Sequence, residues 1–207
     1  MGSIVFAGGI RIPSQGQVAQ AEFDMSLSAL ARLLARENPD VVVVFGDGAY
    51  GPFKPDWVQQ FAIVVSDFAL AKSEGFEQEQ ERPVPLETAE YLLCSLVKDH
   101  NVDMAFCEQV TLGLPFFTAF RCSEKVPVLP FLINSSKPPT PSVFRCDYVG
   151  AAIAAVIGRR DANERVALLS VDAGGEPMLN WAVMAAATGQ QGKKMRQGVY
   201  MHQVSLG

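Results

Sequence analysis

Residues 41–45 are four valines followed by a phenylalanine, bounded by Pro39-Asp40 and by a Gly-Asp-Gly turn at residues 46–48. A strand with one face in water alternates apolar and polar residues. An unbroken apolar run therefore predicts a strand buried on both faces, at the centre of a sheet. Such a strand needs other elements packed over both sides of its sheet.

The segments around this run alternate between strand and helix patterns. Helices are predicted at 22–37, 86–99, 147–159 and 176–188, and further strands at 61–65, 102–107, 126–133 and 165–170. The prolines at 127 and 130 place the strand at 126–133 at an edge or a bulge. We expect one α/β domain over residues 1–207, with a central, largely parallel or mixed sheet flanked by helices.

Composition excludes several classes of protein. The chain has 207 residues, 49% of them apolar, a net charge of −5, and no basic block of the kind that binds nucleic acid. It has no apolar stretch long enough to span a bilayer and no basic leader, so neither a membrane nor a secretory signal is expected. The four cysteines show no paired spacing, which indicates reduced thiols in a cytoplasmic protein.

Five segments, in order along the chain, resemble class III extradiol ring-cleaving dioxygenases. They are 40–53 (DVVVVFGDGAYGPF), 82–89 (RPVPLETA), 109–115 (QVTLGLP), 126–134 (VPVLPFLIN) and 173–181 (AGGEPMLNW). The resemblance implies the family fold and a ferrous iron held by two histidines and a glutamate, with a further histidine for acid–base work. Those positions fall at Arg11, Gly48, Glu176 and Leu112, so the carboxylate alone is retained.

The two histidines of the chain do not stand at these positions. His100 ends a predicted helix, where its bland interpretation is a surface residue favoured by the helix dipole, and His202 lies in the tail. No cofactor is expected, unless the mapping is wrong and Fe(II) binds. Asp47 and Glu176 are weak candidates for a hard cation, against the simpler interpretation of a turn residue and a helix-start residue.

Other interpretations of this region stay open. Arg11 and Glu176 could form an ion pair in place of the metal. The pocket candidates are Asp47, Tyr50, Phe53 and Glu176, with Trp57 and Phe61 in the same aromatic group, although such a group is more often core.

Three functions fit these residues. The first is a catalytically degenerate relative acting as a non-catalytic subunit or structural partner of an active iron-bearing subunit, in a homo- or hetero-oligomer. The second is an active dioxygenase on catechol-like aromatics with non-standard ligands. The third is a protein that binds a small aromatic ligand without chemistry. Whether the chain is an enzyme is therefore open at this point.

Overall fold

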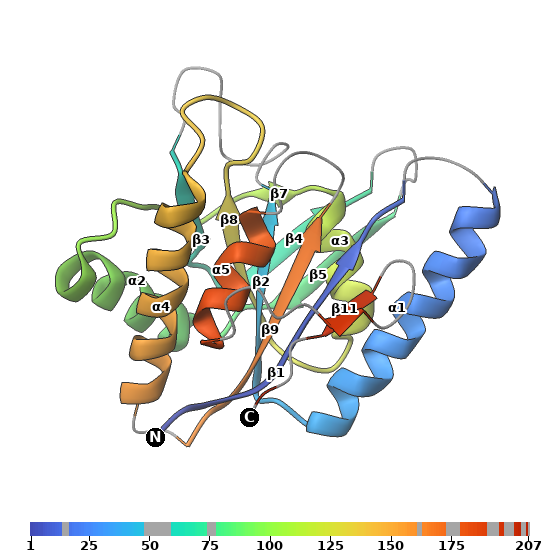
Figure 1. The fold of residues 1–207 in the computed structure, drawn as a ribbon, viewed down its shortest axis with the longest axis horizontal. Helices are drawn as coiled ribbons and strands as arrows, with labels where there is room; N and C mark the ends of the chain where they lie inside the picture. Colours follow the sequence, from blue (N-terminus) through green and yellow to red (C-terminus); the bar gives the residue numbers. More distant parts are fainter. Residues whose placement is uncertain are drawn as a thin grey trace.

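The computed structural model describes residues 1–13, 17–47, 59–73, 78–160, 163–172, 179–189, 195–196, 201–203 and 206. These residues form an α/β fold in which helices cover both faces of a mixed sheet, as predicted (Figure 1). The amino terminus lies at one end of the sheet, beside the start of β9 (Arg165–Asp172), in both views. Within the described residues, no helix is long and apolar enough to cross a membrane.

The main sheet has eight strands in the order β10-β11-β1-β9-β2-β8-β3-β6. Its strands are β1 (Ser3–Arg11), β2 (Val41–Asp47), β3 (Phe61–Val64), β6 (Ala105–Cys107), β8 (Val128–Ile133), β9 (Arg165–Asp172), β10 (Met195–Arg196) and β11 (Met201–Gln203). The four central strands β1, β9, β2 and β8 are parallel, whereas β3 runs antiparallel to β8, and β11 runs antiparallel to β1. The carboxyl ends of the four central strands therefore meet at one edge.

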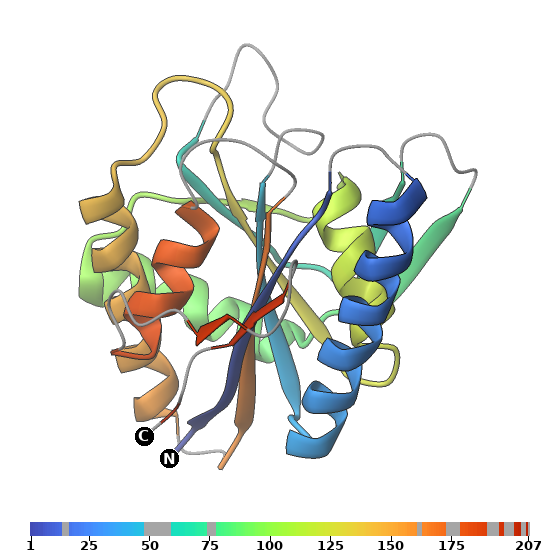
Figure 2. The same cartoon turned by 45° about the vertical axis from the view of Figure 1, so that its right-hand side comes forward.

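A smaller sheet and five helices complete the fold. The second sheet has the order β5-β4-β7, formed by β4 (Phe68–Lys72), β5 (Glu79–Pro83) and β7 (Thr111–Leu112). The helices are α1 (Gln17–Glu37), α2 (Leu86–His100), α3 (Leu114–Cys122), α4 (Val143–Arg159) and α5 (Leu179–Ala187). Figure 2 shows α1 and α3 on one side of the main sheet, and α4 and α5 on the other.

The core is centred on the strand that the valine run predicts. All five residues of 41–45 are buried, with exposed fractions of 3% or less. Phe45 packs edge-on against Phe131 of β8, with ring centroids 5.6 Å apart, and Phe61 of β3 lies 6.2 Å from the same ring. Continuous apolar runs on neighbouring strands thus interlock under both helical layers.

One strand prediction is wrong in its placement. Although β8 contains Pro130, it is an internal strand between β2 and β3, with every residue buried. The antiparallel ladder to β3 runs from Phe131 to Ile133, so Pro130 lies just outside it and removes no donor from that ladder. Pro127 precedes the strand, and its carbonyl accepts the N–H of Val42 at 3.0 Å.

Several other boundaries differ from the expectation. α1 begins earlier than residue 22, and α4 begins at Val143, where the Ser142 hydroxyl accepts the backbone N–H of Arg145. The expected strand at 102–107 shortens to Ala105–Cys107, and the expected start of the last helix at residue 176 lies outside the described residues. Sequence reasoning did not find β1, β4, β5, β7, α3, β10 or β11.

Candidate functional site

A row of polar residues lies at the carboxyl edge of the central parallel strands. Arg11 ends β1, Asp172 ends β9 and Asp47 ends β2. Arg11 is the register partner of Asp172. Gly46 is aligned with Val171, so Asp47 and Asp172, the next residue of each strand, also lie side by side. Adjacent strands lie about 4.8 Å apart, so the backbones from which the three side chains extend are close neighbours.

The three side chains share the face of the sheet that α5 covers. A Cβ on Gly46 would lie 2.9 Å from the Phe116 ring of α3, which places Gly46 on the α3 face and Asp47, the next residue, on the opposite face. A Cβ on Gly9 would lie 3.3 Å from Trp181 of α5, and Arg11 points to the same side as Gly9. We call this set, Arg11, Asp47 and Asp172, the edge row.

Asp47 is held by the loop that follows β8. Its Oδ2 accepts a hydrogen bond from the Ser135 hydroxyl at 2.5 Å, whereas its Oδ1 is buried and has no protein partner. The neighbouring Asn134 is fixed in turn, because its side chain donates to the Lys137 carbonyl and accepts the Lys137 N–H. The end of β2 is therefore tied to a hydrogen-bonded turn at the end of β8.

Asn180 of α5 places a second unpartnered oxygen near the edge row. Its Nδ2 donates to the Val171 carbonyl and to Asp172 Oδ1, both at 3.1 Å, which fixes the orientation of the amide and leaves Oδ1 buried without a partner. The Ser170 hydroxyl, fully buried two residues before Asp172, also has no partner. Buried polar atoms are normally satisfied, so these oxygens indicate a place for ordered water or a polar ligand.

This donor set does not fit the ferrous site that the resemblance implies. Non-haem iron of that kind uses two neutral imidazoles and one carboxylate. The edge row offers two carboxylates beside a guanidinium, which has no lone pair to give to a metal, and its neighbours Asn180, Ser135 and Ser170 add amide and hydroxyl oxygens. Across the described part of the chain, no group of three or more His, Cys, Asp or Glu side chains could hold a metal ion.

The sequence-predicted site residues fall into two groups. Arg11 is exposed at the end of β1, Asp47 is half-buried at the end of β2, and Leu112 is buried in β7 with 1% exposure. Gly48, Tyr50, Phe53, Trp57 and Glu176 lie outside the described residues, as does the side chain of His202. The Arg11–Glu176 ion pair and the Asp47–Glu176 cation site therefore stay predictions, while Phe61 is part of the core.

Asp172, Asn180, Ser135 and Ser170 were missed as site residues. Asp172 directly follows the apolar run of β9, just as Asp47 follows that of β2, and this shared position was the available signal. Nothing in the sequence marks Asn180, which becomes recognisable only when α5 is packed against the end of β9. His100 is the last residue of α2, as predicted.

Curated proteins that are similar to this chain belong to the kind of enzyme that its sequence resembles. No protein-family model matches the chain. The chain is 32% identical over 151 residues to the 2,3-dihydroxyphenylpropionate/2,3-dihydroxicinnamic acid 1,2-dioxygenase of Escherichia coli O81 (strain ED1a), covering 69% of this chain and 44% of that protein. It is 33% identical over 129 residues to the protein of the same name from Escherichia coli O139:H28 (strain E24377A / ETEC), covering 58% and 38%.

The chain thus spans less than half the length of the curated relatives that it matches. The similarity to both proteins is distant and partial. These relatives support an extradiol-dioxygenase-like family for the chain.

Proposed function

We propose that this chain is a catalytically degenerate relative of extradiol dioxygenases, and that it serves as a non-catalytic subunit beside an iron-bearing subunit. The observation that carries the proposal is Arg11, a permanently charged guanidinium at the carboxyl end of β1, where the resemblance places the first iron-ligating histidine. Its register partner is Asp172, a carboxylate of the same sheet edge. A cation at that place opposes the binding of a second cation.

Leu112 supports the same proposal through the acid–base step of the reaction. The resemblance places the acid–base histidine at this position, and here the side chain is an alkyl group with 1% exposure. A buried leucine can neither accept nor donate a proton. Under this proposal, Arg11 and Leu112 leave the chain without a metal ligand and without a proton-transfer group at two of the positions that the resemblance assigns.

An exposed apolar surface on α2, α4 and β6 supports the role as a subunit. Tyr148 of α4 donates its hydroxyl to the carbonyl of His100 at 2.5 Å, and Arg145 lies 3.5 Å from Asp103, so the end of α2 adjoins the start of α4. Large apolar side chains are exposed on these elements: Phe144 (81%), Phe106 (56%), Val143, Val97 and Tyr148. Exposed apolar side chains on adjoining elements are typical of protein interfaces.

Metal loading and turnover test the non-catalytic part of the proposal. Protein purified without oxygen, incubated with Fe²⁺ and freed of excess metal, should retain far less than one iron per chain by mass spectrometry. It should also fail to cleave 2,3-dihydroxyphenylpropionate. Near-stoichiometric iron together with ring cleavage would overturn the proposal in favour of an active dioxygenase with non-standard ligands.

Assembly is tested separately, with an iron-bearing dioxygenase from the same cell. The complex should elute as one species whose ring-cleaving activity differs from that of the iron-bearing subunit alone. Phe144→Ser should weaken the association, whereas Phe68→Ser, which changes an equally bulky exposed side chain on β4, should not. If both variants associate equally well, α4 is not part of the interface. If the wild type does not associate, the chain is not a subunit of such a complex.

A second candidate function is the binding of a small polar aromatic at the sheet edge. The unpartnered oxygens of Asp47, Ser170 and Asn180 favour it, because a ligand hydroxyl could donate to them. A catechol that raises the melting temperature without being consumed would support this function. No shift at millimolar catechol would exclude it.

A further inference from the structure

A groove lies between α1 and the segment that joins α3 to β8, with a volume of about 610 Å³. Residues Leu34 and Ala35 precede β2, and Lys125 and Val126 precede β8, so one end of the groove lies near the amino ends of these strands. The edge row lies at the opposite ends of these strands. The groove is therefore separate from the edge row, and its binding properties are independent of the proposed function.

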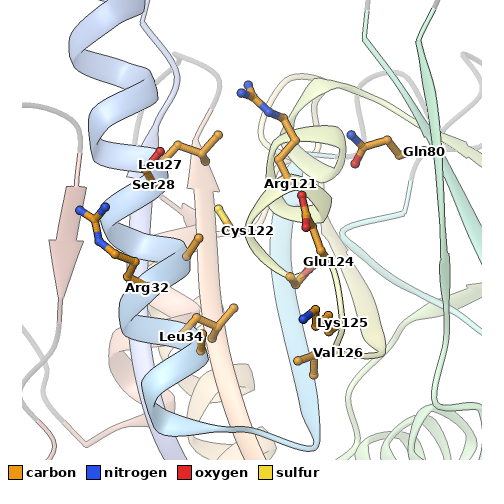
Figure 3. Close-up of a pocket in the computed structure, with 13 residues that line it drawn as sticks. Leu27, Ser28, Arg32, Leu34, Gln80, Arg121, Cys122, Glu124, Lys125 and Val126 are labelled. Carbon is orange, nitrogen blue, oxygen red and sulfur yellow. The ribbon is translucent and has the colours of Figure 1, made fainter.

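The sequence of α1 explains why the groove is hollow and why its floor is apolar. Small residues, Ser28, Ala31 and Ala35, recur at helical spacing on the side that faces α3. In Figure 3, Leu27 and Leu34 extend from α1 towards Cys122 and Val126 on the other wall. The Cys122 thiol belongs to this apolar lining, since burial raises its pKa to about 12 and keeps it neutral at physiological pH.

Most of the charged side chains that line this groove are cations. Three cations, Arg32, Arg121 and Lys125, and one anion, Glu124, line the groove, whereas the chain as a whole carries a net charge of −5. Arg121 is paired with Asp24 at 3.2 Å in an exposed contact, so its charge is only partly neutralised. A local excess of cations on an acidic protein favours an anion at this place.

Gln80 adds an unsatisfied polar atom to the groove. It reaches the groove from β5, and its Oε1 is buried without a hydrogen-bond partner. Figure 3 shows its amide group directed towards the same space as Arg121. Buried amide oxygens are rarely left unpaired, so this acceptor calls for a hydrogen-bond donor, which a water that bridges it to a bound anion can supply.

We propose that this groove binds a small organic anion with an apolar body. The apolar body lies between α1 and the Cys122–Val126 wall, and the anionic group lies beside Arg121, with Lys125 adding to the positive charge along the same wall. An alkyl carboxylate has both parts, so the probe is octanoate. Octanamide, which has the same shape and no charge, and acetate, which has the charge and little apolar surface, separate the two contributions.

Calorimetric titration of the full chain with these three compounds tests the proposal. Octanoate should bind, octanamide and acetate should bind at least tenfold more weakly, and added salt should weaken octanoate. The double variant Arg121→Gln/Lys125→Gln should weaken octanoate by about tenfold, at roughly threefold for each partly exposed cation. The control Arg36→Gln/Lys98→Gln removes the same charge from exposed positions outside the groove and should leave the affinity unchanged.

Two single variants test the geometry. Asp24→Asn removes the carboxylate that competes for Arg121 and should tighten octanoate by about twofold. Ala35→Trp fills the groove from an exposed position, where the fold tolerates it, and should abolish binding. The proposal is overturned if octanoate does not bind, if octanamide binds equally well, or if the control weakens binding as much as the groove variant.

Discussion

At the scale of single residues, Asp47 links the sheet edge to the loop after β8. Its carboxylate receives the Ser135 hydroxyl across 88 positions of sequence, and its second oxygen is buried without a partner. A carboxylate in such a place is costly to leave unpaired. The bond to Ser135 therefore contributes both to stability and to holding the aspartate in position within the edge row.

Ser135→Ala should lower the free energy of unfolding by about 1–2 kcal/mol, because it leaves the half-buried carboxylate without its donor. Asp47→Ala should cost a similar amount, and the double variant should cost clearly less than the sum of the two. Urea unfolding measures all three. Ser66→Ala, which removes an exposed hydroxyl bond to the Phe68 carbonyl, should change stability by less than about 0.5 kcal/mol; additive costs for Asp47 and Ser135 would disprove the coupling.

Sequence reasoning reached only part of this site. Arg11 and Asp47 stood out because the family resemblance places functional positions at or beside them, and both do lie at the carboxyl edge. Asp172, Ser135 and Asn180 were not found, since their contribution depends on which strands are neighbours and where α5 docks. Strand order is a long-range property that a single sequence does not display.

At the scale of elements, α4 and α5 pack closely against each other. Gly150 of α4 makes this possible, because a Cβ there would lie 2.2 Å from the Val183 carbonyl and 2.8 Å from the Ala186 methyl group. Ala-rich faces on both helices complete the contact. Because α5 carries Asn180, this packing also sets the position of that side chain beside Asp172.

Gly150→Ala should destabilise the protein by about 1–3 kcal/mol, because α5 would have to move away from α4. Gly158→Ala provides a matched control in the same helix. A Cβ there meets nothing within 4 Å, so the substitution should stabilise by about 0.5–1 kcal/mol through helix propensity. Thermal or urea unfolding measures the stability of both variants. Equal effects of the two substitutions would contradict the close contact between Gly150 and α5.

The elements differ in how far the sequence could predict them. The buried strand at 41–45 and the amphipathic helix at 86–99 have strong periodic patterns, and both were found close to their observed bounds. α3 was missed because it is buried almost all round, so its apolar residues form no stripe. β4, β5 and β7 are short strands that pair only with one another, and their sequences carry little periodicity.

At the scale of the whole molecule, the buried thiols connect packing with pH. Burial raises the pKa of Cys122 and Cys146 from the ordinary value of 9.0 to about 12, and that of Cys107 to about 11. The folded protein therefore keeps three protons that the unfolded chain releases above pH 9. Since the unfolded state binds fewer protons there, the contribution of these thiols to the free energy of unfolding falls as pH rises from about 9 towards 12.

Cys122→Ala isolates the contribution of one thiol. Between pH 8 and pH 10 the Cys122 thiol should account for a loss of about 1 kcal/mol in the wild type, as the unfolded chain ionises and the folded protein does not. The variant should start less stable at pH 8, because it loses buried volume, but its stability should fall less over this interval. Cys94→Ala changes an exposed thiol and should follow the wild-type pH profile. Urea unfolding at the two pH values measures the decrease in the free energy of unfolding. If this decrease were the same for Cys122→Ala as for the wild type, the fold would not protect the thiol from ionisation. The Cys122 side of the groove would then not be a neutral surface.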